Sequence, residues 1–179
     1  MPEAQVIVDF QNDFTPGGAL AVPEGDRIAE HLNALAADPR FDVVVATRDW
    51  HPPDHSSFEH HGGPWPAHCV QDSEGAQLHP ELDHERLDVI LDKGRNPDTE
   101  GYSGFEDTGL ERLLSERGID RVTVVGLATD YCVKNTALEA LHHGFEVTVD
   151  SAGVRGVDVR PGDSERALAE LREAGVEVR

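Results

Sequence analysis

The sequence predicts an α/β fold, a doubly wound and mostly parallel sheet of six strands with helices on both of its faces. Short runs rich in valine and isoleucine alternate along the chain with longer amphipathic runs. Strands that alternate with helices in this way form parallel sheets through right-handed crossovers. The short runs are also apolar at successive positions, as strands buried on both faces are. We expect the 179 residues to form one domain, 1–179.

Six segments have the length and composition of buried strands. Each is short and rich in valine or isoleucine. In chain order they are "AQVIVDF" (4–10), "FDVVVAT" (41–47), "RLDVILD" (86–92), "RVTVVGL" (121–127), "FEVTVDS" (145–151) and "GVEVR" (175–179).

Four longer segments place their apolar residues on one face of a helix. The second of them also ends at a glycine, a common residue just past a helix C-terminus. They are 26–38 with Ile28, Leu32 and Leu35, 108–118 with Leu110, Leu113 and Leu114, 135–144 with Leu138 and Leu141, and 164–175 with Leu168 and Leu171.

One segment, from about Arg48 to Leu82, has no helical pattern and is rich in proline, histidine and aromatic residues. A loop of this length without secondary structure is uncommon in a compact domain unless it has a function. We therefore expect part of a binding or catalytic site in this segment.

Composition argues against several classes of protein. The net charge of −20 disfavours nucleic acid and anionic membranes as partners, because both attract basic surfaces. No apolar run approaches the ~20 residues of a membrane span. Two cysteines without a secretory signal favour a reducing cytoplasm. Only two of the fifteen basic residues are lysines, which fits either a high-salt habitat or a high-GC genome.

The predicted strands deliver reactive side chains to one edge of the sheet. Ligands of open parallel sheets bind at the carboxyl ends of the strands. The first strand leads to Asp9, the second to Asp49, the third to Lys93, and the fourth through a short turn to Cys132. Four such residues at one edge predict a catalytic or binding site.

Cys132, Lys93 and Asp9 together have the chemistry of an activated nucleophile. A cysteine in the first turn of a helix is often structural. A helix N-terminus and a nearby ammonium nevertheless lower the pKa of a thiol. Lys93 can supply that ammonium and Asp9 can balance its charge, which favours catalysis over packing.

Asp49, His51, His55 and His68 form a candidate ligand set for one divalent metal ion. A carboxylate with two or three imidazoles suits Zn²⁺, Fe²⁺ or Mn²⁺. The set lies in the proline-rich segment after the second strand, where a rigid loop can hold ligands in place. The other cysteine, Cys69, directly follows one of these histidines, and we expect it to be structural.

Several motifs resemble those of nicotinamidases, also called pyrazinamidases, of the isochorismatase-like cysteine hydrolase superfamily. The resemblance extends from Val6 almost to the C-terminus, with the motifs in the order of the family and at similar spacing. They are "VDFQNDF", "RDWHPPDHSSF", "WPAHCV", "DKG", "GYSGF" and "GLATDYCVKNTALEAL".

The resemblance implies an isochorismatase-like hydrolase fold and a role for each matching residue. The catalytic residues of the family correspond to Asp9, Lys93 and Cys132, and its metal ligands to Asp49, His51, His55 and His68. Its oxyanion hole corresponds to the backbone N–H groups of Ala128 and Cys132, with a cis peptide between Leu127 and Ala128. Its substrate-binding aromatics correspond to Phe14, Trp65 and Tyr102, and Tyr131 is a further candidate.

The implied reaction converts nicotinamide to nicotinate and ammonia through a thioester on Cys132, and pyrazinamide to pyrazinoate likewise. The metal would hold the pyridine nitrogen, and Asp9 would carry the thiol proton to the departing ammonia. The resemblance also implies a role in recycling nicotinamide toward NAD. The sequence leaves open whether the protein is a monomer or a homo-oligomer.

Two other functions remain open from the residues alone. A related amidase for carbamoyl compounds would share Asp9, Lys93 and Cys132 without needing a metal to hold a ring nitrogen. A metal- or redox-sensing protein would use the cysteine and histidines without turning over an amide. An isochorismatase that cleaves a vinyl ether is disfavoured, because it lacks the nucleophilic cysteine.

Overall fold

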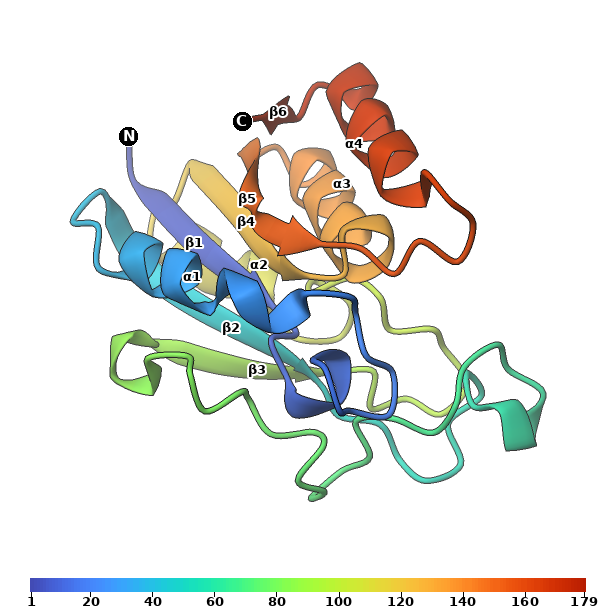
Figure 1. The fold of residues 1–179 in the computed structure, drawn as a ribbon. Helices are drawn as coiled ribbons and strands as arrows, with labels where there is room; N and C mark the ends of the chain where they lie inside the picture. The colour runs from blue at the N-terminus through green and yellow to red at the C-terminus, as the bar shows by residue number, and fades with distance from the viewer.

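The computed structural model describes residues 1–179 and contains one six-stranded sheet, in the order β3-β2-β1-β4-β5-β6 (Figure 1). Every pair of neighbouring strands is parallel, so the sheet is wholly rather than mostly parallel. The strands are β1 Glu3–Val8, β2 Phe41–Asp49, β3 Val89–Lys93, β4 Arg121–Leu127, β5 Glu146–Arg155 and β6 Glu177–Val178.

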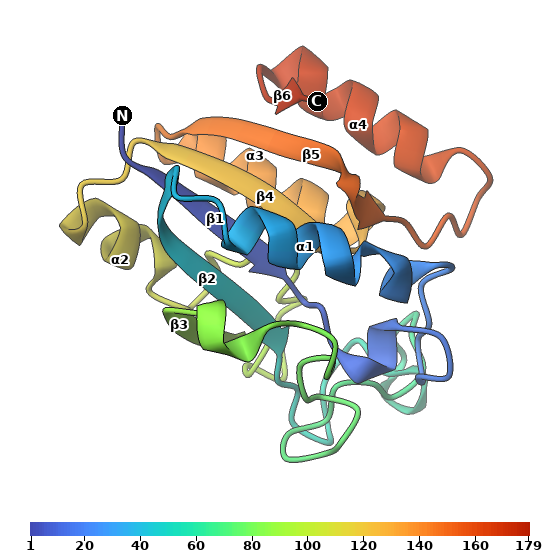
Figure 2. The same ribbon diagram turned by 60° about the vertical axis from the view of Figure 1, so that its left-hand side comes forward.

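Four α-helices cover the two faces of this sheet (Figures 1 and 2). They are α1 Ala29–Ala36, α2 Leu110–Glu116, α3 Lys134–His142 and α4 Asp163–Ala174. Helix α1 contributes to one hydrophobic core, and the other three helices contribute to a second core on the opposite face. The doubly wound arrangement predicted from the alternating pattern is therefore confirmed.

The central strand β1 shows how the chain builds two cores. All six of its residues are buried, because β2 and β4 pair with it on either side and helices cover both of its faces. Successive side chains of a strand point to opposite faces. Val6 and Val8 accordingly pack in the core with α2, α3 and α4, and Ile7 packs in the core with α1.

The element boundaries differ from the predicted ones for local reasons. Strand β1 ends at Val8, because Asp9 has a φ of 49° and leaves the extended conformation. Helix α1 begins at Ala29, because Gly25–Ile28 forms a 3₁₀ turn ahead of it. Strand β5 continues to Arg155, and a bulge interrupts its pairing with β4 between Val124 and Gly126.

The long segment after β2 has no α-helix, as predicted. It contains a single 3₁₀ turn at Glu59–His61 before Leu82. Isolated bridges join His51 to Val70 and Phe58 to Trp65. Short pairings therefore fix this segment beneath the carboxyl edge of the sheet. No helix in the structure combines the length and the apolar character that a membrane crossing requires.

Gly126 gives a stability test of the contact between β1 and β4. Its φ is 115°, and a Cβ there would overlap the carbonyl oxygen of its partner Val8. We expect Gly126→Ala to lower the free energy of unfolding by about 3 kcal/mol or more, measured by urea denaturation. Gly144 has a φ of 90° with open space around its missing Cβ, so Gly144→Ala should cost only about 1–2 kcal/mol. Equal losses in the two variants would contradict the overlap.

Candidate active site

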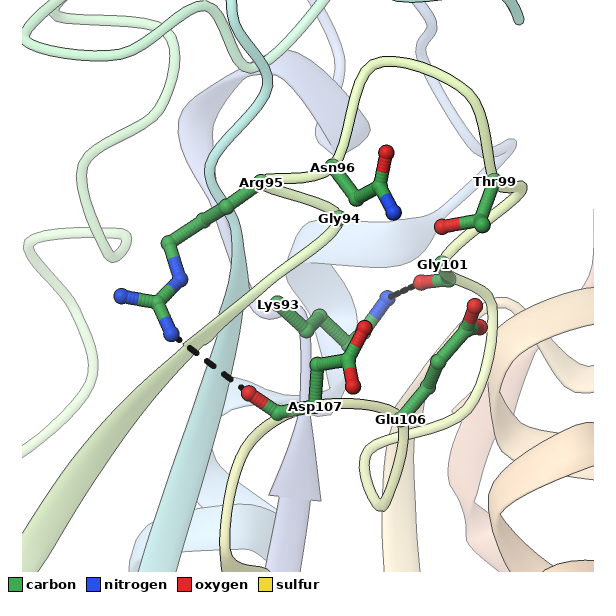
Figure 3. Close-up of a pocket in the computed structure, with 8 residues that line it drawn as sticks. All are labelled: Lys93, Gly94, Arg95, Asn96, Thr99, Gly101, Glu106 and Asp107. Carbon is green, nitrogen blue, oxygen red and sulfur yellow. Dashed lines mark hydrogen bonds between the residues drawn. The ribbon is translucent and has the colours of Figure 1, made fainter.

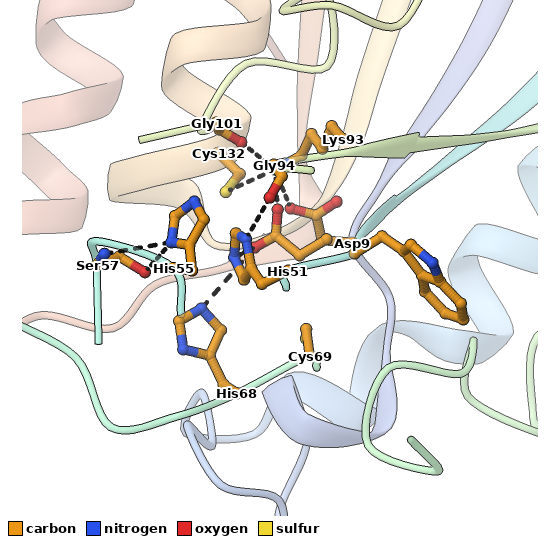
Figure 4. Close-up of polar contacts among 12 residues, drawn as sticks. Asp9, His51, His55, Ser57, His68, Cys69, Lys93, Gly94, Gly101 and Cys132 are labelled. Carbon is orange, nitrogen blue, oxygen red and sulfur yellow. Dashed lines mark hydrogen bonds and ion pairs between the residues drawn. The ribbon is translucent and has the colours of Figure 1, made fainter. Parts of the chain in front are cut away.

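Four buried side chains meet at the carboxyl edge of the sheet, each brought there by a different strand. Asp9 follows β1, Asp49 ends β2, Lys93 ends β3, and Cys132 lies in the turn after β4. Strands β2 and β3 pair Asp49 directly with Lys93. Figure 4 shows Asp9, Lys93 and Cys132 close together, with His51 and His68 beside them. The structure thus brings together residues that the sequence separates by up to 123 positions, from 9 to 132.

The ammonium of Lys93 connects these groups. Nζ donates to Asp49 Oδ1 at 2.6 Å, to the carbonyl oxygen of Gly101 at 2.8 Å and to Cys132 Sγ at 3.4 Å. It also lies 2.9 Å from Asp9 Oδ2. Burial disfavours the charged amine, but the Asp49 and Asp9 carboxylates outweigh that effect and raise its pKa well above the ordinary value. Lys93 is therefore an ammonium with all three N–H groups engaged.

Asp9 is placed to accept a proton. Its Oδ1 accepts a hydrogen bond from Thr47 Oγ1 at 2.8 Å. Its Oδ2 is close to the ammonium of Lys93 but has no hydrogen-bond partner, because the ammonium protons point to other acceptors. Burial raises the pKa of Asp9 to about 6, against the opposing charge of Lys93. A carboxylate with this pKa is a suitable base near neutral pH.

The surroundings of Cys132 differ from the sequence-based expectation. Thr129–Val133 forms one π-helical turn ahead of α3, so the cysteine precedes the α-helix instead of lying in its first turn. Burial raises the pKa of its thiol well above the ordinary value, and the Lys93 ammonium does not reverse this. The expected lowering of the pKa was therefore wrong for the resting site. Burial thus favours the protonated thiol in the resting site.

One backbone carbonyl group accepts two hydrogen bonds within the turn that carries Cys132. The carbonyl oxygen of Ala128 accepts hydrogen bonds from the backbone N–H groups of Tyr131 and Val133, both at 3.1 Å. The peptide bond between Leu127 and Ala128 is cis, as the resemblance implied. The backbone nitrogens of Ala128 and Cys132 consequently belong to the same tight turn.

A carboxylate and two imidazoles form a candidate metal centre next to the thiol. The ligand atoms of Asp49, His51 and His68 all lie within 4.8 Å of one another. Asp49 Oδ2 is 3.3 Å from His51 Nε2 and 4.0 Å from His68 Nε2. Backbone carbonyls of Gly94 and Pro66 accept from the Nδ1 atoms of the two histidines, each at 2.8 Å. With Nδ1 as the donor, the neutral form of each ring presents an unprotonated Nε2, the atom that binds metal.

The charges within this centre follow from burial and from the lysine beside it. Burial opposes ionisation of Asp49, but the charges of Lys93 and His51 hold the pKa of Asp49 well below its usual range. Burial likewise opposes protonation of His51, but the Asp49 carboxylate raises the pKa of that imidazole. Burial dominates at His68 and lowers its pKa. The centre thus combines an ionised carboxylate with a neutral imidazole, the forms that bind metal.

The fourth predicted ligand, His55, lies outside this group of three. Its ring lies against that of His51, with centroids 3.9 Å apart and the ring planes tilted by 35°. Its Nδ1 accepts from the backbone N–H of Ser57 at 3.2 Å and lies 2.6 Å from the Ser57 hydroxyl, while its Nε2 has no partner. A role for His55 as a ligand stays a prediction.

An apolar pocket opens beside Cys132 and the candidate metal centre. All four predicted aromatics line it, namely Phe14, Trp65, Tyr102 and Tyr131. Leu20, Ala128 and Val157, together with Asp49, His68 and Cys132, complete the wall. The indole N–H of Trp65 donates to the hydroxyl of Tyr102 at 3.1 Å, and the Trp65 ring meets Tyr131 edge-on. The cavity is narrow, at about 30 Å³, and its aromatic walls with a few polar groups suit a flat, mostly apolar molecule with one reactive group.

A separate polar cavity of about 290 Å³ lies near Lys93 (Figure 3). No apolar side chain lines it. Its two basic residues, Lys93 and Arg95, are matched by the acidic Glu106 and Asp107, and Arg95 also donates to the Asp107 carbonyl oxygen at 3.4 Å. It has neither the aromatic walls nor the thiol of the other pocket, so we place the candidate active site in the apolar one.

Comparisons with known proteins agree with this geometry. The sequence pattern of the isochorismatase domain matches residues 3–179. The nicotinamidase of Escherichia coli (strain K12) is 44% identical over 97% of this chain and 92% of its own length. The chain belongs to the isochorismatase family. Among solved structures, pyrazinamidase of Pyrococcus horikoshii in complex with zinc is 47% identical with a TM-score of 0.92, covering 100% of this chain and 99% of that one.

A further structure, PnC1 from L. infantum in complex with nicotinate, is 42% identical with a TM-score of 0.95, covering 99% of this chain and 92% of that one. The isochorismatase-like fold predicted from the sequence is thus confirmed. The name of the family does not imply that this protein cleaves a vinyl ether. Its site has a buried cysteine beside a lysine and an aspartate, and an isochorismatase lacks the nucleophilic cysteine.

Gln11 has a positioning role in this isochorismatase-family chain that sequence reasoning missed. Its side-chain amide accepts from the backbone N–H of Asp49 and donates to the Asp49 carbonyl oxygen, both at 2.8 Å, and donates also to Ala76 at 2.8 Å. The amide therefore pairs with Asp49 as a neighbouring strand would. A signal existed in the sequence, because a glutamine in an apolar motif at the end of a central strand needs buried partners.

The other missed contributors are backbone carbonyls. Gly94 and Gly101 supply the oxygens that accept from His51 and Lys93. Both glycines have a positive φ, and a Cβ on Gly94 would press against the His51 ring. Spacing in the sequence gives no indication of which carbonyl a folded loop will present.

Gln11 provides a test of how the metal centre is supported. We expect Gln11→Ala to weaken binding of a divalent metal about 10–100-fold, because Asp49 loses the amide that holds its backbone. The measurement is a zinc titration of the apoprotein by calorimetry. Gln77→Ala, which changes an exposed glutamine of the adjoining loop, is the control and should leave affinity unchanged. Equal affinities in the two variants would contradict the role of Gln11.

Proposed function

We propose that this protein hydrolyses the amide of nicotinamide to give nicotinate and ammonia, and that of pyrazinamide to give pyrazinoate. One observation carries the proposal. A single aromatic-walled pocket borders the thiol of Cys132 and also Asp49 and His68 of the candidate metal centre. A pyridine ring between the aromatics can therefore direct its carboxamide to the thiol and its ring nitrogen to the metal centre. The similarity to nicotinamidases along nearly the whole chain supports the same reaction.

In the first step Cys132 Sγ attacks the carboxamide carbon as Asp9 Oδ2 takes the thiol proton. The unpartnered state of Oδ2 and the raised pKa of Asp9 suit it to accept that proton. The Lys93 N–H that already points to Sγ stabilises the negative charge on sulfur as the proton leaves. The burial that keeps the resting thiol protonated thus makes proton transfer part of the attack.

The tetrahedral intermediate then collapses to a thioester. We assign the backbone N–H groups of Ala128 and Cys132 to its oxyanion, where one such donor is typically worth ~3–4 kcal/mol of the barrier. Asp9 returns its proton to the nitrogen of the substrate, the C–N bond breaks, and ammonia leaves. Water next attacks the thioester and gives a proton to Asp9. The C–S bond breaks, the proton on Asp9 returns to Sγ, and the acid product loses its carboxyl proton to solvent and is released as nicotinate.

Asp49, His51 and His68 are the residues that we assign to a divalent metal ion, as the convergence of two histidine Nε2 atoms and a carboxylate oxygen fits such an ion. When bound, the ion supplies a Lewis acid that anchors the ring nitrogen. We propose Zn²⁺, Fe²⁺ or Mn²⁺, all of which accept this donor set. We further propose that the reaction recycles nicotinamide toward NAD in the cytoplasm.

An amidase for carbamoyl compounds is the rival function. It would use Asp9, Lys93 and Cys132 in the same way, but a small polar substrate would gain nothing from four aromatic side chains or from a metal centre in the same pocket. The sensor alternative gives no reason for an aromatic pocket beside the thiol. The combination of features therefore favours nicotinamide.

The test is ammonia release from nicotinamide by the purified protein, before and after chelation and after addition of Zn²⁺, Fe²⁺ or Mn²⁺. We expect turnover to fall with the chelator and to return with a metal ion. Cys132→Ala should lower kcat at least about 10³-fold while the metal content stays that of the wild type. Turnover indifferent to metal would favour the carbamoyl amidase, and no turnover with metal bound would refute amide hydrolysis of nicotinamide.

The raised pKa of Asp9 predicts an acid limb in the pH profile. Asp9 accepts a proton only when ionised, so kcat/KM should fall as the pH decreases through about 6. Thr47→Val removes the hydrogen bond that favours the ionised form and should move this limb upward by about one unit.

The control for this shift is Thr123→Val. Thr123 is likewise buried and donates to a carboxylate, that of Glu3, at 2.7 Å, but at the opposite end of the sheet. Its removal should leave the acid limb in place. If the two variants gave the same profile as the wild type, Asp9 would not be the group that titrates.

A further inference from the structure

Asp130 is a buried carboxylate in the same turn as Cys132 that the proposed mechanism does not use. Its side chain is only slightly exposed, at 7% for the residue. Oδ1 accepts from the backbone N–H of Val157 at 2.9 Å, and Oδ2 accepts from that of Asp158 at 2.8 Å. Both partners belong to the loop that follows β5. The two bonds therefore fasten that loop to the turn that carries Cys132.

Val157 is the residue through which this fastening reaches the substrate. It lines the apolar pocket together with Ala128 and Cys132, and it packs against the hydrophobic core that contains Phe14. Unlike the other residues of the pocket wall, it comes from the loop after β5. Its position at the pocket depends on how that loop is held.

The loop is tied at its other side to helix α4. Asp158 has a φ of 52°, and its carboxylate accepts from the backbone N–H of Ser164 at 2.7 Å and from the Ser164 hydroxyl at 3.0 Å. A Cβ on Gly156 would overlap the Ser164 hydroxyl and would approach Asp130 Oδ1. The loop therefore lies close against two neighbours, and Asp130 provides the link on the side of the active site.

We propose that Asp130 is a positioning residue that holds Val157 as one wall of the substrate pocket, and so restricts the pocket to flat rings without substituents on that side. This inference rests on the proposed function, since it concerns the substrate of the same pocket. Asp130 touches neither the reacting atoms nor the candidate metal centre. Loss of Asp130 should weaken substrate binding, because a pocket wall that is loose in the free variant must become ordered when the substrate binds.

Backbone hydrogen bonds that do not involve the Asp130 side chain hold the turn around Cys132. A change at Asp130 can therefore affect substrate binding without affecting the chemical step. The Ala128 carbonyl oxygen accepts from the N–H groups of Tyr131 and Val133, and neither bond involves the Asp130 side chain. Loss of the carboxylate should therefore leave the thiol in place. A residue that merely stabilised the fold would not separate KM from kcat in this way.

The first experiment uses Asp130→Asn, which keeps the shape of the side chain but turns one acceptor into an NH₂ group facing a backbone N–H. We expect KM for nicotinamide to rise about tenfold with kcat within about twofold of the wild type. The control is Asp163→Asn, which removes another carboxylate that accepts a backbone N–H, from Arg160 at 2.9 Å, and should leave both constants unchanged. A fall in kcat without a change in KM would overturn the proposal.

The second experiment asks whether Asp130 acts through Val157. Val157→Ala should permit turnover of a methyl-substituted nicotinamide that the wild type rejects. Adding Asp130→Asn to Val157→Ala should raise KM by much less than it does in the wild type, because the wall it supports has been removed. Independent, additive effects of the two substitutions on KM would overturn the proposal. Failure of Val157→Ala to turn over the methyl-substituted nicotinamide would overturn it even if Asp130→Asn proved too unstable to assay.

A third measurement needs no substrate. Hydrogen exchange at the Val157 and Asp158 amides should accelerate at least about tenfold in Asp130→Asn and stay unchanged in Asp163→Asn. Unchanged exchange at both amides would refute the fastening itself. If these amides accelerated but the wild type did not hydrolyse nicotinamide, the proposed function would fail while the structural role of Asp130 held.

Discussion

The buried ammonium of Lys93 is the group on which the rest of the site depends. It contacts two carboxylates, a backbone carbonyl oxygen and the thiol, and each of these partners comes from a different segment of the chain. One ammonium balances one carboxylate, and Asp49 is the stronger partner. Asp9 is therefore left as the carboxylate with the raised pKa, near 6. The contrast between an ionised Asp49 and a titrating Asp9 follows from this imbalance.

The carboxylate of Asp49 joins the two halves of the site. One oxygen accepts from Lys93, and the other faces the Nε2 atoms of His51 and His68. Gln11 fixes the backbone of the same residue from both sides. These contacts hold the Cys132 thiol and the candidate metal centre in place relative to each other, and the aromatic pocket borders both. Such rigidity is what orientation of a reactive amide over a nucleophile requires.

Much of this arrangement was predictable from the sequence, and the failures have physical causes. Asp9, Lys93 and Cys132 could be found because strand ends in a parallel sheet converge on one edge. The direction of the pKa shift at Cys132 could not be predicted, because the effects of a helix end and a nearby ammonium on a thiol pKa do not take burial into account. The contact of the Gly101 carbonyl oxygen with Lys93 could not be predicted either, because it depends on how a loop folds and involves no side chain of Gly101.

The cluster of charges has a consequence for how the sheet assembles. Asp9, Asp49 and Lys93 stand on or beside β1, β2 and β3, which are neighbours in the sheet. A slip of one residue between any two of these strands would turn a charged side chain away from its partner and leave it buried alone, at a cost of several kcal/mol. The residues that make the site reactive therefore also penalise incorrect alignments during folding. A variant with neutral residues at all three positions would lose this discrimination together with its chemistry.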